Sequence, residues 1–490
     1  MRVRASLLSV AVFVLFACWG LISPVGSSPD DDYHLASIWC AGGLVEDFCE
    51  QSPNDPDELL VPEELAAGHA CYAFRPERNA SCADDLTSSP VSVNHVNQKK
   101  GLYPGVFYGV MGLFAGSDVD FSVLVMRVVN SALAALLLFG SLVLAPKGIA
   151  RALATATLIV YVPLGLFLIP STNPSSWALT GVSTFWACGV SLLLRTSWHS
   201  GRTWFLAGGV VVGGILAAGA RLDAAVYLSI VTVVAFVAVG VRQVRANVAG
   251  ALLMAFMALW GLVIYWTTQP TVTQGRGPTS ADDPGPLLFL DNAVDVPRYM
   301  WESFSGPLGW LDTAIPAFMP TFGLMLLGAV AYRQLSQGAS RVLLASTFAL
   351  VAYLAVPVVF LQLSGLQVGE LIQARYLLPI LFVLVATASL APRMRRPFPW
   401  PRLAALVVVS VLGAGAGVAF WSNARRYATS GNGSVFDPRT EIVWTGLIPG
   451  SWWIVVSVGL VATAVVFTVG YSFLIRERTG SPRVAFRPAT

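Results

Sequence analysis

Stretches of about 20 apolar residues recur along this chain of 490 residues, and they constrain its fold more than any other feature. A helix of about 20 apolar residues is long enough to cross the hydrocarbon core of a bilayer. Backbone N–H and C=O groups in lipid must be satisfied within their own segment, so each stretch must be a helix. Twelve such segments are expected, at residues 5–23, 121–145, 151–170, 175–195, 203–219, 223–241, 247–267, 313–332, 342–363, 376–391, 402–421 and 450–475.

Composition supports the same fold class. Hydrophobic residues make up 55% of the chain and charged residues only 12%, whereas a soluble domain has about 25% charged residues. The chain is therefore expected to be an all-α polytopic membrane protein with about 12 transmembrane helices. The first segment, after Arg2 and Arg4, resembles a signal peptide. No small-x-small cleavage site follows it, so we expect a retained first helix.

The distribution of charge predicts the topology. With the N-terminus inside, the short inner segments hold 18 of the 30 Lys and Arg residues, and Glu477 is the only one of the 27 acidic residues there. Basic residues gather in cytoplasmic loops, so an even number of spans with both termini cytoplasmic is expected. The net charge of +3 carries no signal of nucleic-acid binding.

This topology divides the chain into six parts. Neither large outer loop has the length or apolar content of an autonomous domain, so both are expected to pack on the helices as a cap. The parts are the first transmembrane helix (1–24), a large extracytoplasmic loop with amphipathic helices and four cysteines (25–120), transmembrane helices 2–7 (121–267), a second extracytoplasmic loop (268–312), transmembrane helices 8–12 (313–475) and a cytoplasmic tail (476–490).

Four cysteines, Cys40, Cys49, Cys71 and Cys82, lie in the first outer loop. Cysteines gathered in an exported loop favour two disulfides, with three possible pairings. Free thiols or a metal site are the alternatives, but no CxxC or His/Cys spacing supports zinc. No metal site is predicted from these residues.

An acidic turn, Asp30-Asp31-Asp32, directly follows the first helix. Adjacent carboxylates beside a low-dielectric phase repel one another, which should raise at least one pKa. This suits a general base, or a cation site, next to a lipid-borne substrate. The alternative is a solvated turn that caps a following amphipathic helix at 33–44.

Arginines near the outer face form a second group of candidates. Arg375 begins the tenth helix and could hold two phosphate oxygens, or it could anchor the helix at the interface. Arg127 lies within the second helix, where an ionisable residue is a functional candidate, unless it pairs with a loop carboxylate. Arg221 and Asp223 favour a local ion pair.

Common catalytic motifs are absent. The sequence contains no Walker A loop, GxSxG or HExxH motif, and its four histidines lack metal-ligand spacing. The inner loops are too short for a nucleotide-binding domain. Chemistry is therefore expected at the outer face.

Five segments carry a resemblance to a bacterial membrane family, domain of unknown function 2142. The acidic turn with His34 resembles its Pro-Asp-Glu-x-x-His signature, with Asp31 where the family often has Glu. The segment 373–379 resembles its Gln-Gly-Arg-Tyr-x-x-Pro motif, with Ala374 where Gly is common. The other three resemblances are at 103–108, 171–174 and 309–313. The resemblance implies the cell (inner) membrane of a bacterium.

That family is similar in organisation to GT-C glycosyltransferases, multi-span enzymes with an acidic catalytic residue in the first outer loop. The resemblance implies inverting transfer of a sugar from a polyprenyl-phosphate donor to an envelope glycan or glycolipid outside the membrane. Asp30 or Asp31 would be the base, and Arg375, with Arg425 or Arg426, would stabilise the departing phosphate. No cofactor would be required, although a divalent cation could bind at Asp30–Asp32. The expected substrate-binding residues are Asp32, His34, Arg127, Asn173, Trp310, Asp312, Gln373, Arg375 and Tyr376.

Two other classes of function stay open. Twelve spans with inside termini are also a common layout for a transporter or lipid flippase, although the sequence has no paired half-repeats and few buried charges. A non-catalytic assembly partner in envelope synthesis is the third reading. A transporter should have two similar halves and a midplane cavity, whereas a transferase should have an outer-face cavity above the first-loop acids, with a lateral opening to lipid.

Overall fold

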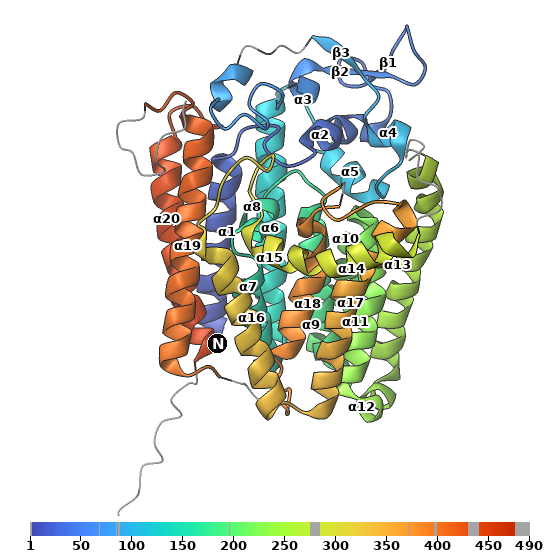
Figure 1. Ribbon diagram of the computed structural model, residues 1–490, viewed down its shortest axis with the longest axis vertical. Coiled ribbons are helices and arrows are strands. Elements are labelled where there is room, and N and C mark those ends of the chain that lie inside the picture. Colours follow the sequence, from blue (N-terminus) through green and yellow to red (C-terminus); the bar gives the residue numbers. More distant parts are fainter. Residues whose placement is uncertain are drawn as a thin grey trace, which may run out of the picture.

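A computed structural model gives the fold as a bundle of long helices with a smaller cap over one end (Figure 1). It describes the chain except for residues 1, 68, 85, 87–88, 196, 275–284, 371, 396–398, 430–440 and 476–490. The expected cytoplasmic tail at 476–490 lies outside the described residues. The end of the bundle under the cap is called the cap face below.

Nine helices among the described residues are long and apolar enough to cross a membrane. This confirms the prediction of an all-α polytopic membrane protein. The nine are α1 (Arg2–Leu21), α6 (Val119–Leu144), α9 (Ser175–Leu193), α10 (Gly201–Ala220), α11 (Leu222–Val239), α13 (Val248–Gln274), α17 (Ser340–Ser364), α19 (Arg402–Ala428) and α20 (Trp452–Leu474).

The other three expected segments are also helical, but two of them are shorter than a span. The segment 151–170 is divided into α7 (Lys147–Val160) and α8 (Leu164–Leu168) near Pro163, whose backbone has no N–H to continue a helix. The segment 376–391 forms η3 (Ala374–Leu377) and α18 (Leu378–Ala388), and every residue of α18 is buried. A helix surrounded by protein need not match the bilayer thickness. The third segment is α16 (Phe318–Gln337).

Small residues allow the central helices to approach closely. A Cβ added to Gly181 of α9 would lie 2.6 Å from the Ala217 nitrogen of α10, and one added to Gly213 would lie 2.7 Å from the Phe185 nitrogen. Membrane helices pack through such small residues because lipid provides no hydrophobic drive for association. α9 is consequently buried along its whole length.

At the end opposite the cap, arginines donate to the last carbonyl groups of helices. Arg202 donates to the Leu144 oxygen of α6 (2.8 Å), and Arg151 donates to the Ile475 oxygen after α20 (2.6 Å). Arg341 reaches the Val239 oxygen at the end of α11 (3.3 Å). Cations at helix C-termini satisfy free carbonyls and oppose the negative end of the helix dipole. These three residues belong to the set that the charge pattern places inside; the orientation itself stays a prediction.

The cap contains both helices and a small sheet, where the sequence predicted helices alone. Its sheet is antiparallel in the order β1-β2-β3, with Leu59 paired to Val93. The expected amphipathic helix at 33–44 is instead α2, which starts two residues earlier and is buried at eight of its nine residues. The cap elements are α2 (Asp31–Trp39), η1 (Cys40–Gly42), β1 (Glu50–Gln51), β2 (Leu59–Pro62), α3 (Glu63–Ala67), η2 (Ala80–Ala83), β3 (Pro90–Val93), α4 (Asn97–Lys100) and α5 (Gly105–Gly112).

Two disulfides close loops of the cap, as the cysteine count predicted. Cys40 pairs with Cys49, and Cys71 pairs with Cys82. The cap also packs on the bundle, since the rings of Phe107 and Trp177 meet edge to face at 5.3 Å. Three further helices connect the bundle: α12 (Val241–Ala246), α14 (Pro286–Asp295) and α15 (Pro297–Ser305).

Candidate active site at the cap face

Asp30 lies between α1 and α2 in a left-handed backbone conformation, with φ 61° and ψ 21°. This conformation costs energy for a residue with a side chain, and such residues are concentrated at functional sites. The side chain does not cap α2. Its Oδ2 instead accepts a hydrogen bond from Arg375 Nη2 at 2.5 Å, and 37% of the side chain is exposed.

Arg375 comes from η3, 345 positions further along the chain. Its guanidinium is buried and also donates to Gln373 Oε1 and to the Tyr376 hydroxyl, the latter at 3.3 Å. Its Nε is buried without a hydrogen-bond partner among the described residues. The structure thus joins the acidic turn to the arginine motif, and roles in catalysis or binding stay predictions.

The charge of Arg375 governs the ionisation of Asp30. Burial opposes ionisation of this carboxyl, but the nearby Arg375 and Arg221 outweigh it and hold the pKa of Asp30 below its ordinary value. Asp30 is therefore an ionised carboxylate with one exposed side, paired with a fixed cation.

Aromatic residues support the arginine motif. The Tyr227 hydroxyl donates to the Tyr376 carbonyl oxygen at 3.2 Å. Arg221 packs over the Tyr376 ring at 4.0 Å from its centroid and forms the expected pair with Asp223 at 2.9 Å. Neither Arg221 nor its stacking was a predicted part of the site, because the sequence signal was only the two-residue spacing to Asp223.

Asp31 points away from Asp30 and is fully buried. Its Oδ2 accepts from the Ser28 backbone N–H at 3.0 Å, and its Oδ1 accepts from the Thr172 hydroxyl at 3.1 Å. Burial raises the pKa of Asp31 to about 7. Both oxygens are engaged inside the protein, so this carboxyl anchors the turn.

The third carboxylate has a different partner again. Asp32 is half-buried and lies 4.0 Å from Nε2 of His95. The described part of the chain holds no group of three His, Cys, Asp or Glu side chains placed to bind a metal. The three carboxylates of the turn therefore diverge, and they do not form a ready ligand set for the divalent cation considered from sequence.

His34 lies one turn of α2 beyond Asp30 and is completely buried. Its Nδ1 is 2.8 Å from the Tyr108 hydroxyl, and its Nε2 has no hydrogen-bond partner among the described residues. Burial lowers the pKa of His34 to about 3, so the ring is neutral at physiological pH.

Asn173 contacts the backbone of the acidic turn. Its Nδ2 donates to the Pro29 carbonyl oxygen at 2.7 Å, and its Oδ1 accepts from the Ser175 N–H at 2.8 Å. The turn before α9 therefore clamps the segment that carries Asp30. In this position Asn173 is a positioning residue for the turn.

Arg127 is engaged with the end of α1. It donates to the Gly20 and Pro24 carbonyl oxygens, both at 2.8 Å, and to the Ser23 carbonyl oxygen. Gly20 lies in the last turn of α1 and the other two residues follow it, so Arg127 satisfies carbonyl groups at and just beyond the end of the helix. Among the residues that the structure describes, Arg127 forms no ion pair with a loop carboxylate, which was the alternative that the sequence left open.

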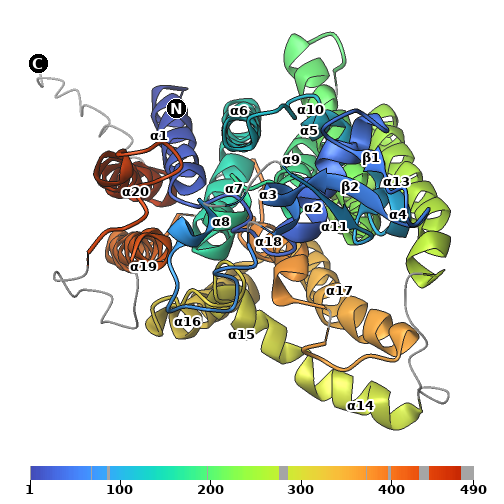
Figure 2. The ribbon, with the colours of Figure 1, turned by 90° about the horizontal axis from the view of Figure 1, so that it is seen from above.

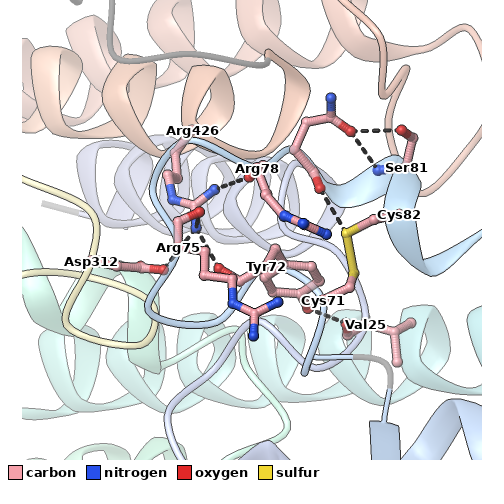
Figure 3. The surroundings of a disulfide bond; sticks show 10 residues. Val25, Cys71, Tyr72, Arg75, Arg78, Ser81, Cys82, Asp312 and Arg426 are labelled. Carbon is pink, nitrogen blue, oxygen red and sulfur yellow. Dashed lines mark hydrogen bonds and ion pairs between the residues drawn. A yellow bond between two sulfur atoms is a disulfide. The ribbon is translucent and has the colours of Figure 1, made fainter.

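Trp310 and Asp312 belong to a neighbouring cluster, part of which is drawn in Figure 3. Asp312 pairs with Arg426 at 2.8 Å, and the same guanidinium nitrogen donates to the Tyr72 carbonyl oxygen at 2.8 Å. The Trp310 Nε1 donates to the Gly26 carbonyl oxygen at 2.8 Å. This cluster connects the loop closed by Cys71–Cys82 to α19. None of the hydrogen bonds or ion pairs between described residues joins Trp310, Asp312 or Arg426 to Arg375.

The Asp30–Arg375 pair provides a partly exposed carboxylate next to a cation whose Nε has no partner among the described residues. An anion arriving at Arg375 would compete with Asp30 for the same N–H groups. A neutral hydroxyl beside Asp30 could give up its proton to the carboxylate. The arrangement therefore suits the binding of an anionic group and proton abstraction within one small space.

Comparison with known proteins finds a match to a family model. No curated protein and no solved structure matches the chain. A family model, described as "predicted membrane protein (DUF2142)", matches residues 13–384. The matched range contains the acidic turn, the Asn173 turn, the Trp310–Asp312 segment and Arg375, and it spans most of the 490 residues. The chain therefore belongs to this family of membrane proteins.

Proposed function

We propose that this protein is a GT-C-like, inverting glycosyltransferase. It would move a sugar from a polyprenyl-phosphate donor to an extracytoplasmic envelope glycan or glycolipid. The observation that carries the proposal is the contact between the partly exposed Asp30 carboxylate and the buried Arg375 guanidinium, 2.5 Å apart at the cap face. The proposal places the cap outside the plasma membrane of a bacterium, with both chain ends in the cytoplasm.

Arg375 is the proposed donor-phosphate ligand. A guanidinium holds two phosphate oxygens at once through parallel N–H bonds. The Gln373 and Tyr376 side chains fix its position from the same segment. Because burial removes competing water, the fixed charge would stabilise the negative charge that develops on the departing phosphate.

Asp30 is the proposed base, in preference to Asp31. Asp31 uses both oxygens within the protein, whereas Asp30 is partly exposed. When a phosphate takes over Arg375, Asp30 loses its counter-charge, and its affinity for a proton rises. Donor binding would thus activate the base.

The transfer then needs one displacement. The acceptor hydroxyl gives its proton to Asp30 while its oxygen attacks the anomeric carbon from the side opposite the phosphate. The bond between that carbon and the phosphate oxygen breaks, and the electron pair leaves with the lipid phosphate on Arg375. One displacement of this kind inverts the anomeric configuration. No cofactor enters these steps.

The test uses purified protein in lipid nanodiscs, a panel of labelled polyprenyl-phosphate sugars and membrane extract as the source of acceptors. Transfer of label by the wild-type protein, lost in Asp30→Asn, is the expected result. No transfer with any donor, together with movement of a lipid or solute across reconstituted vesicles, would replace the proposal with the transporter reading.

A further inference from the structure

α14 is too short to cross a bilayer and lies across the direction of the long helices (Figure 1). Seen from above, it runs along the rim of the bundle next to α17 (Figure 2). The helix starts with Pro286 in its first turn, where the missing N–H does no harm. Its position and length exclude both a span and a core helix.

The outward side of α14 is apolar. Leu287, Leu290 and Val294 are 73%, 56% and 76% exposed, and their spacing places them on one face. Phe289, at 45% exposed, widens this apolar face. On the opposite, protein-facing side, Asn292 is buried.

Acidic residues mark one edge of this face. Asp291 and Asp295 are exposed and lie between the apolar face and the side of α14 that packs on the protein. A short helix with an apolar face and a charged edge is typical of a helix lying in the plane of a membrane interface. In water, the same face would be an exposed apolar patch without a cover.

The position of α14 beside the spanning helix α17 indicates that lipid covers the apolar face of α14. α17 is one of the helices long and apolar enough to span the membrane. α14 is hydrogen-bonded to the loop that follows α17, since Asn292 Nδ2 donates to the Leu366 oxygen at 2.9 Å. Val359 and Leu363, near this end of α17, are 51% and 75% exposed. The apolar surface of α14 thus continues a surface that the bilayer must cover.

We propose that α14 is an interfacial helix, with its face of Leu287, Leu290 and Val294 embedded in the bilayer leaflet next to the cap. Its partner is the lipid surface itself. This inference rests on burial, spacing and the neighbouring span, and it does not depend on the proposed transferase activity.

The embedded helix has a structural connection to the candidate site. The Val368 N–H donates to Asn292 Oδ1 at 3.0 Å, and the Tyr299 hydroxyl of α15 donates to the Ile372 oxygen at 3.0 Å. Residues 366–372 lead directly into the segment that carries Arg375. Through these two contacts, α14 and α15 hold the segment that carries Arg375 at a fixed depth relative to the lipid surface.

Site-directed spin labelling in nanodiscs tests the proposal. Single cysteines replace Leu287, Leu290 and Val294 of the apolar face, and Asp291 and Asp295 of its edge. Val461→Cys in α20, where the native side chain is 65% exposed, is the lipid reference, and Asp57→Cys, exposed in the cap, is the water reference. The native cysteines interfere little, since Cys18 and Cys188 are buried and the other four are in disulfides.

The measurement compares collisions of each label with oxygen, which concentrates in lipid, and with a water-soluble nickel chelate. Labels at 287, 290 and 294 should have an oxygen-to-nickel ratio several-fold above that at 57 and close to that at 461. Labels at 291 and 295 should lie nearer the water reference. A water-like ratio at all five positions would overturn the proposal. Low collision rates with both reagents would also overturn it, since they indicate cover by protein.

Discussion

At the scale of single residues, three adjacent carboxylates of one turn have three different environments. Asp30 faces Arg375 and the surface, Asp31 faces inward to Ser28 and Thr172, and Asp32 lies near His95. The sequence predicted the acidic turn and the arginine motif as candidates. It could not separate Asp30 from Asp31, because a left-handed backbone at one residue decides which side chain turns outward.

Arg127, Trp310 and Asp312 illustrate a second limit of sequence at this scale. Each is a polar or aromatic residue near the end of the helix bundle, where the sequence does not distinguish a residue that binds substrate from one that stabilises the fold. In the structure Arg127 binds the carbonyls that end α1, and Asp312 binds Arg426. A single sequence does not reveal these partners, because they lie 100 or more positions away along the chain.

Asp31 predicts a pH-dependent stability. Its pKa of about 7 in the folded protein exceeds the ordinary value of about 3.9 for an unfolded chain. The folded state therefore binds more protons between these values, and this residue's contribution to stability falls as pH rises from about 4 to 7, then levels off. Thermal unfolding of Asp31→Asn in detergent should lose this slope. The Asp30→Asn variant should keep the slope between pH 5 and 7, because the pKa of the native Asp30 carboxyl is already below its ordinary value. Equal slopes in wild type and Asp31→Asn would contradict the assignment.

Arg375→Lys tests whether geometry as well as charge matters at the phosphate. Lysine keeps the charge but cannot form the paired N–H bonds. Loss of one hydrogen bond to a charged group costs about 2 kcal/mol, or about 30-fold in kcat/KM for the lipid donor. Steady-state kinetics with varied donor measures this. Unchanged kcat/KM in a folded variant would remove Arg375 from the donor site.

At the scale of elements, hydrophobic runs and cysteines predicted most of what the structure contains. All twelve apolar segments are helical, and the four loop cysteines form two disulfides. Pro163 could have indicated the division between α7 and α8 from the sequence, but the three-stranded sheet, the short length of α18 and the position of α14 were not predictable. Each depends on neighbours: α18 can be short because protein surrounds it, and α14 is apolar outside because lipid is there.

The Cys71–Cys82 disulfide closes the loop whose carbonyls bind Arg426. The chain-entropy estimate for a loop of this length is about 3 kcal/mol. The double variant Cys71→Ser, Cys82→Ser should therefore unfold at a lower temperature, measured by a thermal melt in detergent. Cys40→Ser, Cys49→Ser is the matched control: it removes a disulfide of similar loop length that does not enclose the Arg426 contacts. A smaller loss for the 71–82 pair than for the control would contradict a role for this loop in holding the cap to α19.

At the scale of the whole molecule, the cap and the arginine-rich end define two opposite faces. The charge pattern predicts that the arginine-rich end is cytoplasmic. A single cysteine at Arg393 should react with an impermeant maleimide only after cells are opened, whereas one at Asp57 should react in intact cells. Labelling of the Arg393 position from outside would contradict the topology and, with it, an extracytoplasmic active site.

The account depends most on Asp30, which the fold aims at the surface and pairs with Arg375, while Asp31 supports the turn from within. The direct measurement is sugar transfer from labelled polyprenyl-phosphate donors by Asp30→Asn and Asp31→Asn, assayed side by side in nanodiscs after both are shown to be folded. Loss of a general base costs about 100- to 10,000-fold in rate. We predict that loss for Asp30→Asn, with Asp31→Asn within a few-fold of wild type at pH 7. Full transfer by Asp30→Asn would contradict the account.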